Sequence, residues 1–284
     1  MKTTSVIFLI LSLVLIIAGT TVCLVTQSMA QNSGVNLFAH GFDANNNGVY
    51  TEQLSDSTVN KIVVRAKNAD VIIKSGESSS ITLKNYSIGS YYMAVSNKNL
   101  TFEEGVGLMS LFKFSSGSFS FNGLRQFLNF DGFKGKNKAV EIVVGKDETL
   151  KHIEIEIENG NVNIEGNTVT ADYFVTIKNG KAVVDVPGKF STVKVNIDKG
   201  DLTFKTHGNN GKFNAVINEG NAYLILGEST TRAYSLKTEN GSVTHFGSLM
   251  GNSFESSPVG ETSTEYSVNV ASGNISVELH ALSN

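Results

Sequence analysis

Four segments in the middle of the chain share one pattern: HIEIEIENGNVNIEG (152–166), DYFVTIKNGKAVVDV (172–186), TVKVNIDKGDLTF (192–204) and KFNAVINEGNAYLIL (212–226). In each segment a glycine follows two polar or charged residues, which is typical of a tight turn that needs a positive φ. These glycines lie 20 residues apart, at Gly160, Gly180, Gly200 and Gly220. The constant interval predicts a structural repeat of 20 residues.

Apolar and polar residues alternate on both sides of each glycine. The apolar positions fall three, five and seven residues before the glycine and two and four residues after it. Around the first glycine they are Ile153, Ile155, Ile157, Val162 and Ile164. Because residues two apart in a strand face the same side, this period predicts strands rather than helices, and the fold class is predicted to be all-β.

A fixed repeat of this length favours a single-stranded β-solenoid, in which each coil buries its apolar face against its neighbours. At about 3.3 Å per residue, one repeat is long enough for a roughly triangular coil, and coils would stack about 4.8 Å apart. Glu158, Lys178 and Asp198 would then lie above one another and attract, since their charges alternate in sign. The alternative is a series of antiparallel hairpins, because Asn-Gly also favours a hairpin turn. We favour the solenoid because hairpins do not require a constant interval.

Less regular coils are expected on both sides of these repeats, so the solenoid domain is predicted to span residues 58–284. Before the repeats, the segments that include the turns Asn68–Asp70 and Asn97–Asn99 are predicted to be degenerate coils. After the repeats, Tyr234–Val243 is expected to form the next coil and Tyr266–Leu279 the last. Departures from the consensus are expected there because terminal coils cover the open ends of a solenoid.

A phenylalanine-rich insertion at residues 105–138 interrupts the pattern. Its aromatic side chains either fold back to cover the solenoid or form a patch that binds a partner or a membrane, because an exposed apolar surface of this size is uncommon on a monomer. The candidate binding residues are Phe112, Phe114, Phe119, Phe121 and Phe127, and the same segment also contains Phe130 and Phe133.

An apolar run from Val6 to Val25 lies near the start of the chain, after Lys2 and before a stretch with no charge until Asp43. A helix of this length crosses about 30 Å of hydrocarbon, with its positive end in the cytoplasm. Residues 1–26 are therefore predicted to be a transmembrane signal anchor, and the C-terminal domain to be extracytoplasmic. A cleaved signal peptide is the alternative, because a small-x-small pattern ends at Ala30.

Residues 27–57 are polar and are predicted to be a juxtamembrane linker. Within the linker, Asp43–Gly48 resembles the start of a calcium-binding loop, but Leu54 occupies the position of the acid that should close it. This departure favours a flexible linker over a calcium site. Cys23, the only cysteine, lies in the apolar run, so no disulfide is expected. We expect no metal and no cofactor.

The sequence offers few residues with which to build a catalytic site. His207 and His245 fall near predicted turns and are expected to be solvated. The row Glu154, Glu156 and Glu158 contains paired carboxylates of the kind that hydrolyse glycosides, but strand alternation explains these acids as a solvent-facing row. We therefore predict that the chain is not an enzyme. The net charge of −3 gives no reason to expect a nucleic acid as partner.

The segments VEIVVGKDETLKHIEIEIENGNVNIEG (140–166), YFVTIKNGKAVVDV (173–186) and VKVNIDKGDLTF (193–204) resemble a bacterial "putative adhesin" family, a domain of otherwise unknown function. The resemblance covers residues 139–246 closely and residues 58–280 loosely. It implies a β-helix on the cell surface and carries over no catalytic residues. Gly145 stands where the family often has a proline before its first loop, and the insertion has no counterpart in the family pattern.

Together these features predict a membrane-anchored, extracytoplasmic surface module with a structural or adhesive role. Its partners would be the membrane, through the N-terminal helix, and a cell-surface protein or glycan. The alternative is an envelope-stress accessory, in which the domain senses a ligand and acts through a membrane partner.

Overall fold

The computed structural model describes residues 49–54, 59–86, 91–105, 137–145, 150–165, 171–186, 190–206, 211–227, 232–257 and 264–279. These residues form strands joined by turns and contain no helix, which confirms the all-β prediction. None of the described segments is therefore a helix that could cross a membrane. The predicted anchor at residues 1–26, its cleavage site at Ala30 and the calcium-like segment Asp43–Gly48 lie outside the described residues.

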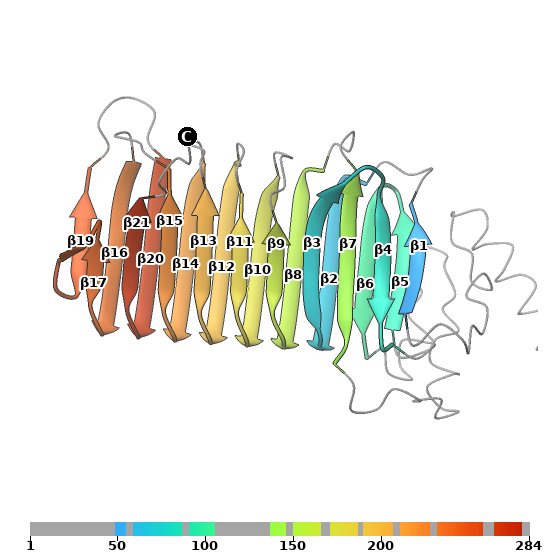
Figure 1. Ribbon diagram of the computed structural model, residues 1–284, viewed down its shortest axis with the longest axis horizontal. Coiled ribbons are helices and arrows are strands. Elements are labelled where there is room, and N and C mark those ends of the chain that lie inside the picture. The colour runs from blue at the N-terminus through green and yellow to red at the C-terminus, as the bar shows by residue number, and fades with distance from the viewer. Residues whose placement is uncertain are drawn as a thin grey trace, which may run out of the picture.

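The strands of the described residues form two sheets that face each other along the whole length of the domain (Figure 1). Sheet A contains, in spatial order, β1 (Val49–Gln53), β4 (Ser80–Lys84), β7 (Ala139–Gly145), β3 (Asp70–Gly76), β9 (Val162–Glu165), β11 (Ala182–Asp185), β13 (Leu202–Thr206), β15 (Ala222–Leu226), β21 (Ile275–Leu279), β17 (Val243–His245) and β18 (Ser248–Leu249). Sheet B contains, in spatial order, β19 (Ser253–Ser256), β16 (Arg232–Asn240), β20 (Thr264–Ser272), β14 (Lys212–Glu219), β12 (Thr192–Lys199), β10 (Asp172–Asn179), β8 (His152–Asn159), β2 (Lys61–Asn68), β6 (Asn99–Glu104) and β5 (Tyr91–Ser96).

The four central repeats stack with the register that the glycines predict. Tyr173 of β10 lies between Ile153 of β8 and Val193 of β12, and the strands run parallel. The hairpin alternative is therefore wrong for residues 152–226. Each of these coils places one strand in sheet B and one in sheet A, so the coil has two sides rather than three.

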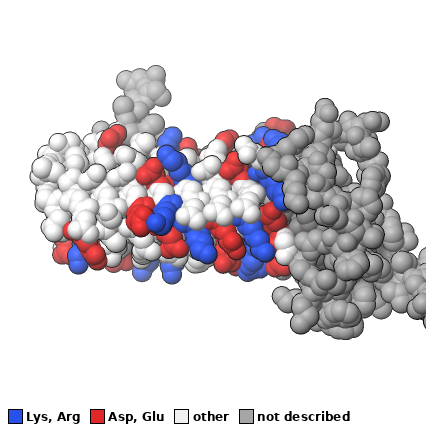
Figure 2. Space-filling view, turned by 90° about the horizontal axis from the view of Figure 1, so that it is seen from below, with Lys and Arg blue, Asp and Glu red and all other residues white. Residues whose placement is uncertain are grey.

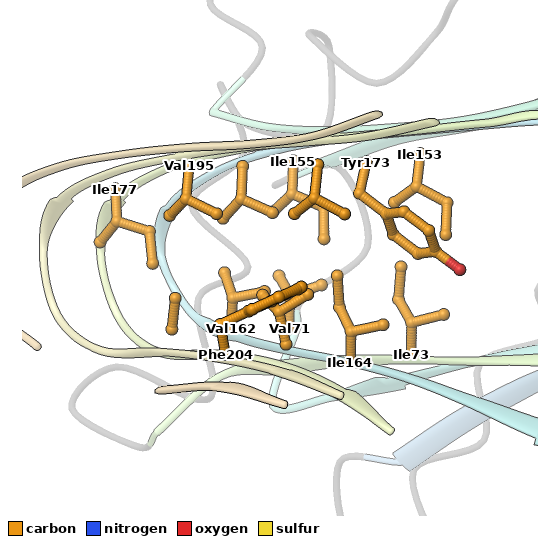
Figure 3. Packing of buried hydrophobic residues seen from close by; sticks show 14 of the residues in the cluster. Val71, Ile73, Ile153, Ile155, Val162, Ile164, Tyr173, Ile177, Val195 and Phe204 are labelled. Carbon is orange, nitrogen blue, oxygen red and sulfur yellow. The ribbon is translucent and has the colours of Figure 1, made fainter. Parts of the chain in front are cut away.

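The core lies between the two sheets and consists of the alternating apolar residues of every coil. Figure 3 shows two facing rows of side chains, with Ile155, Tyr173 and Val195 in one row and Ile164 and Phe204 in the other. Each of these side chains is at most 1% exposed. Burying a side chain of this size contributes about 1.5–3 kcal/mol, so the stacked columns supply most of the apolar stabilisation of the fold.

The turns between the sheets require glycine for two separate reasons. Gly180 has a φ of 147°, which disfavours any residue with a Cβ atom. A Cβ atom on Gly180 would also lie 1.7 Å from the carbonyl oxygen of Gly160 in the coil below. The backbone hydrogen bonds continue through the turn, where the Gly180 amide donates to the Lys199 carbonyl at 2.9 Å. The close approach of the backbones therefore requires a glycine at the same place in each of these stacked coils.

Side-chain amides and carboxylates reinforce the stack beside the glycines. The Lys181 amide donates to Asn161 Oδ1, and the Asn221 amide donates to Asp201 Oδ1, both at 3.1 Å. The prediction that Glu158, Lys178 and Asp198 pair by charge is wrong, because no ion pair joins these three described residues. The three side chains point into water. There, the conformational entropy lost on ordering two long side chains offsets the weak attraction between their charges.

The order of the coils in space differs from their order in the sequence at both ends of the domain. At the C-terminal end β20 pairs with both β14 and β16. The last segment of the chain therefore lies in the stack between the coil that contains β14 and the coil that contains β16. The prediction that Tyr234–Val243 follows Gly220 directly in the stack is therefore wrong. At the N-terminal end β2 lies between β8 and β6, and β7 pairs with β3 and β4. Strands β6 and β7 are thus two halves of one outer coil.

The predicted coil around Asn97–Asn99 is a hairpin. Strands β5 and β6 are neighbours in sheet B and run antiparallel. Asn97 and Lys98 have φ values of 51° and 65°, as the two central residues of a type I′ turn do. The primed turn matches the twist of paired strands, which explains why this polar turn closes a hairpin instead of a coil.

Candidate functional site: the stem of the insertion

The phenylalanine-rich insertion leaves the solenoid at the edge where the neighbouring coils have their glycine turns. Strand β6 pairs with β2 as far as Arg65 and Glu103, and β7 pairs with β3 from Asp70 and Ala139 onward. The insertion therefore replaces the turn of the outer coil. We call Glu104, Gly105, Asn137 and Lys138, which begin and end it, the insertion stem. The candidate residues Phe112, Phe114, Phe119, Phe121 and Phe127 lie outside the described residues.

Glu104 is the central residue of the insertion stem. Because Arg65 pairs with Glu103, the next residue, Glu104, lies beside Ala66. Ala66 in turn pairs with Ile157, so Glu104 belongs to the same inward-facing column as these two residues. The Glu104 side chain is only 5% exposed. A carboxylate therefore occupies a position at which the regular coils have isoleucine, and its burial requires hydrogen-bond partners.

The partners of Glu104 come from the coil that lies next to it. Glu104 Oε2 accepts hydrogen bonds from the backbone amides of Lys67 at 2.7 Å and Asn68 at 3.0 Å. Strand β6 does not pair with β2 beyond Glu103, so the carboxylate takes the place of a strand carbonyl for these two amides. Hydrogen bonds from amides to a carboxylate are stronger than those to a neutral carbonyl.

Lys138 closes the stem from the other end of the insertion. Its Nζ donates to Glu104 Oε1 at 3.0 Å and lies 5.3 Å from the centre of the Tyr86 ring. The Lys138 carbonyl accepts from the Asp70 amide at 3.0 Å, and the Asn137 carbonyl accepts from Asn85 Nδ2. The two ends of the insertion are thus bound to each other, to the β2–β3 turn and, through Asn85, to the end of β4.

Sequence reasoning did not identify Glu104 or Lys138. The charged pair is separated by 34 positions. No periodic pattern connects the two residues, because they lie on either side of the insertion. The only available signal was the boundary itself: an acid in a column that is otherwise apolar, directly before the pattern stops.

Close to the stem, an ion-pair network joins three strands on the outer face of sheet B. Arg65 of β2 pairs with Glu103 of β6 at 3.2 Å and with Glu154 of β8 at 2.7 Å. Lys61 also contacts Glu154, at 3.3 Å, and Arg65 Nε lies 3.4 Å from Glu156. The network crosses from the outer coil to the regular repeats and orients the strand that leads into the stem.

This network also decides how the row of acids can act. Partial burial favours the neutral form of Glu154, but hydrogen bonds from Lys61 and His152 and the charge of Arg65 hold its pKa below the usual value of 4.5. A general acid in glycoside hydrolysis needs a raised pKa instead. Glu154 and Glu156 therefore serve as ion-pair partners on an outer face, and Glu158 extends into solvent.

The remaining candidates do not converge on a second site. Within the described ranges, no group of three or more His, Cys, Asp and Glu side chains could hold a metal ion. The expectation that His245 is solvated is wrong, because its ring lies 4.1 Å from that of Phe254 and 4.9 Å from that of Tyr234. Burial lowers the pKa of His245, and the residue closes the aromatic end of the core.

A profile of the Toastrack DUF4097 family matches residues 112–278. The chain belongs to this family. The match confirms the resemblance that the glycine repeats indicated, and it includes the coils from β7 to β21 as well as part of the insertion. No curated protein sequence matches the chain.

Several solved structures resemble the chain at low sequence identity. A "putative cell adhesion protein" from Clostridium sporogenes is 14% identical, with 82% of this chain and 99% of that chain covered and a TM-score of 0.49. A "putative adhesin" from Bacteroides fragilis is 14% identical, with 81% and 96% covered and a TM-score of 0.39. A "putative lipid binding protein" from Parabacteroides distasonis is 8% identical, with 83% and 98% covered and a TM-score of 0.29. Likenesses this distant carry no information about a ligand.

Proposed function

We propose that the chain is a membrane-anchored, extracytoplasmic adhesion module, in which the solenoid is a rigid scaffold and the insertion at residues 105–138 binds a cell-surface protein or glycan. Residues 1–26 would anchor the chain, and the domain itself would be non-catalytic. The linker between them would be shorter than the predicted residues 27–57, because β1 (Val49–Gln53) pairs with β4 and Leu54 is buried in the core. The proposal places binding on a segment whose sequence contains seven phenylalanines, a residue type that can supply an apolar binding surface.

The observation that carries this proposal is the insertion stem. The hydrogen bond of 3.0 Å between Lys138 Nζ and Glu104 Oε1 holds the two ends of the insertion together. Glu104 also accepts hydrogen bonds from two backbone amides next to the β2–β3 turn. A segment held in this way can differ in sequence without disturbing the coil beside it. Such an arrangement is suited to presenting a recognition segment on a rigid scaffold.

The stem also defines how the insertion should be removed. Four residues separate Arg65 from Asp70, and their partners are Glu103 and Ala139. Deleting residues 106–136 joins Gly105 to Asn137, so that the four residues of the stem separate Glu103 from Ala139. The deletion therefore restores the length of a regular turn and keeps the Glu104–Lys138 pair. We expect the solenoid to stay folded in this variant.

The test measures adhesion of beads coated with the full chain to intact bacterial cells. We expect adhesion to be lost on deleting 106–136 and to fall at least about tenfold when Phe112, Phe119 and Phe127 are changed together to Ser. Tyr223→Ser, which removes a 44% exposed aromatic side chain from sheet A, is the matched control and should adhere normally. Treating the cells with protease or with glycosidases separates a protein partner from a glycan.

Adhesion that survives both changes to the insertion would exclude it as the binding element. Far-ultraviolet circular dichroism of each variant checks that the strands are retained, so a loss of adhesion is attributed to binding only when the spectrum is unchanged.

A further inference from the structure

The C-terminal end of the solenoid is closed by a hairpin with exposed apolar side chains. After β17 the chain turns back into β18, which pairs with β17, and then into β19, which pairs with β16. Phe246, Leu249 and Met250 are 41%, 72% and 37% exposed and lie within five residues of one another. We call these three residues the terminal apolar patch. It lies at the opposite end of the domain from the insertion stem (Figure 1).

The backbone at Phe246 indicates that the exposed ring has been kept at a conformational cost. Phe246 and Gly247 have φ values of 49° and 79° and form the two-residue turn between His245 and Ser248. Asn-Gly is the preferred pair at such a turn, and a bulky residue with a positive φ is an outlier. The Phe246 ring packs 4.0 Å from the His245 ring, yet a large part of it remains in solvent. An outlier of this kind supports a functional role for the side chain.

Both sheets also end here in strands with one open edge. Among the described residues, β19 pairs only with β16 and β18 pairs only with β17. Neither strand contains proline or lysine, two of the residues that commonly protect an exposed edge; β18 is two residues long, and the one charged residue in the two strands is Glu255. On the face seen in Figure 2, this end of the molecule shows few charged side chains apart from those along its border, whereas Lys, Arg, Asp and Glu side chains gather along the middle. An open edge of this composition favours pairing with another strand.

We propose that this end binds the same end of a second copy of the chain, by antiparallel pairing of β19 with β19 and of β18 with β18. A two-fold axis perpendicular to the sheets would join sheet A to sheet A and sheet B to sheet B, and would bring the two terminal apolar patches together. An isologous contact of this kind requires a surface that does not repel itself, which the scarcity of charge provides. The inference goes beyond the proposed function, because it does not involve the insertion.

The charges of β19 select one register for this contact. Phe254 packs on the core opposite Leu236, and Glu255 lies on the outer face opposite Ser235. Pairing centred on Phe254 places Glu255 of one copy opposite Ser253 of the other, whose hydroxyl can donate to the carboxylate. Pairing centred on Glu255 would place two carboxylates opposite each other, which is unfavourable in a sheet. The first register is therefore the one that we propose.

The register can be tested by disulfide cross-linking of the full chain in a Cys23→Ser background, which removes the only native thiol. Ser253→Cys and Glu255→Cys are made in separate chains, mixed in detergent, and exposed to a mild oxidant. Opposite residues in a sheet have Cβ atoms about 4.5–5.5 Å apart, near the range that a disulfide spans. We expect a cross-linked dimer in the mixture and at least about tenfold less in either chain alone.

A second measurement tests the terminal apolar patch. Phe246→Asn, Leu249→Ser and Met250→Ser together should abolish the cross-link, and asparagine keeps the preferred turn, so the hairpin should remain folded. Val216→Ser with Tyr223→Ser, which removes two side chains that are 40% and 44% exposed elsewhere, is the matched control and should leave the cross-link unchanged. A mixture no more cross-linked than its components would overturn the proposal. So would an unchanged cross-link in the triple variant, or patch-dependent binding to phospholipid vesicles without any dimer.

Discussion

The turn at Gly160 and the insertion stem occupy the same edge of the solenoid, two coils apart. At Gly160 the chain crosses from sheet B to sheet A within a few residues, and the backbone of one coil touches the next. At the stem the chain leaves the scaffold, and the Glu104 side chain replaces the missing backbone contact with the amides of Lys67 and Asn68. Figure 2, which views this edge, shows an uncharged band bordered by rows of charged side chains. The regular turn depends on having no side chain, and the interrupted turn depends on having a particular one.

The largest effect should come from adding a methyl group to a regular turn. In Gly180→Ala the new Cβ atom would meet the Gly160 carbonyl oxygen at 1.7 Å and would also carry the cost of a positive φ. We expect a loss of at least about 3 kcal/mol of stability, measured by urea denaturation followed by circular dichroism.

Gly247→Ala is the matched control for this change. Gly247 has a φ of 79°, and a Cβ atom there would have no neighbour within 4 Å. Only the conformational cost applies, so the loss should be about 1 kcal/mol. Equal losses at the two positions would show that the turn requires glycine for its dihedral angle alone, and the argument from stacking would be wrong.

The contrast between these turns explains which parts of the fold the sequence could predict. The central coils follow from signals within 20 residues: a glycine, a polar pair and alternation, which together define strands, turns and register. At the C-terminal end the glycine turns recur at Gly241 and Gly273, but the constant interval of 20 residues is lost. Phe213 pairs with Tyr266, which is 53 positions away, and the inward columns are predominantly apolar, so several orders of the coils would satisfy the pattern equally well. The N-terminal hairpin was missed because Asn97-Lys98-Asn99 has the same polar character as a coil turn.

The candidate site was predictable only in outline. The boundaries of the insertion follow from the point at which alternation stops, and the stem lies at those boundaries. The role of Glu104 depends on Lys67, Asn68 and Lys138, which reach it through the stacking of β2 on β6 and through the return of the chain after the insertion. Contacts of this kind are set by tertiary structure and leave no periodic signal in the sequence.

The second prediction concerns the side chain on which the interrupted turn depends. Glu104→Ala leaves two backbone amides and the Lys138 cation without their acceptor. The native Glu104 side chain is only 5% exposed, so water cannot readily replace it. We expect a loss of about 2–3 kcal/mol in the same denaturation measurement. Glu104→Gln should lose less, because its carbonyl oxygen can still accept from the amides.

Glu219→Ala provides the matched control, since the Glu219 side chain is 60% exposed and pairs with Lys199 at 3.0 Å in the regular part of the edge. Its removal should cost less than about 0.5 kcal/mol. If Glu104→Ala were as mild as Glu219→Ala, the carboxylate would not hold the stem, and the insertion would be fastened by other contacts.

Among Gly180, Glu104 and Asp201, the smallest effect should come from Asp201, a carboxylate that assists a regular turn without being required by it. Asp201 accepts from the Asn221 amide at 3.1 Å and pairs with Lys181 at 3.0 Å. Two coils away, Asn161 accepts from the Lys181 amide in the same way, so the side chain of asparagine can also make this hydrogen bond. Asp201→Asn should therefore cost less than about 1 kcal/mol at neutral pH.

The pH dependence of Asp201→Asn separates the charge from the hydrogen bond. Partial burial favours the neutral acid, but Lys181 and the Asn221 donors outweigh it and hold the pKa of Asp201 below its usual value of 3.8. The carboxylate therefore binds a proton more readily in the unfolded chain than in the folded one. The stability that its charge contributes is complete above pH 3.8 and is lost as the pH falls through the lower pKa of the folded state. The difference in stability between the native chain and Asp201→Asn should accordingly shrink in acid. A difference that stayed constant from pH 7 to pH 3 would mean that Asp201 acts only through the shape of its hydrogen bond, as Asn161 does, and that charge has no part in closing a regular turn.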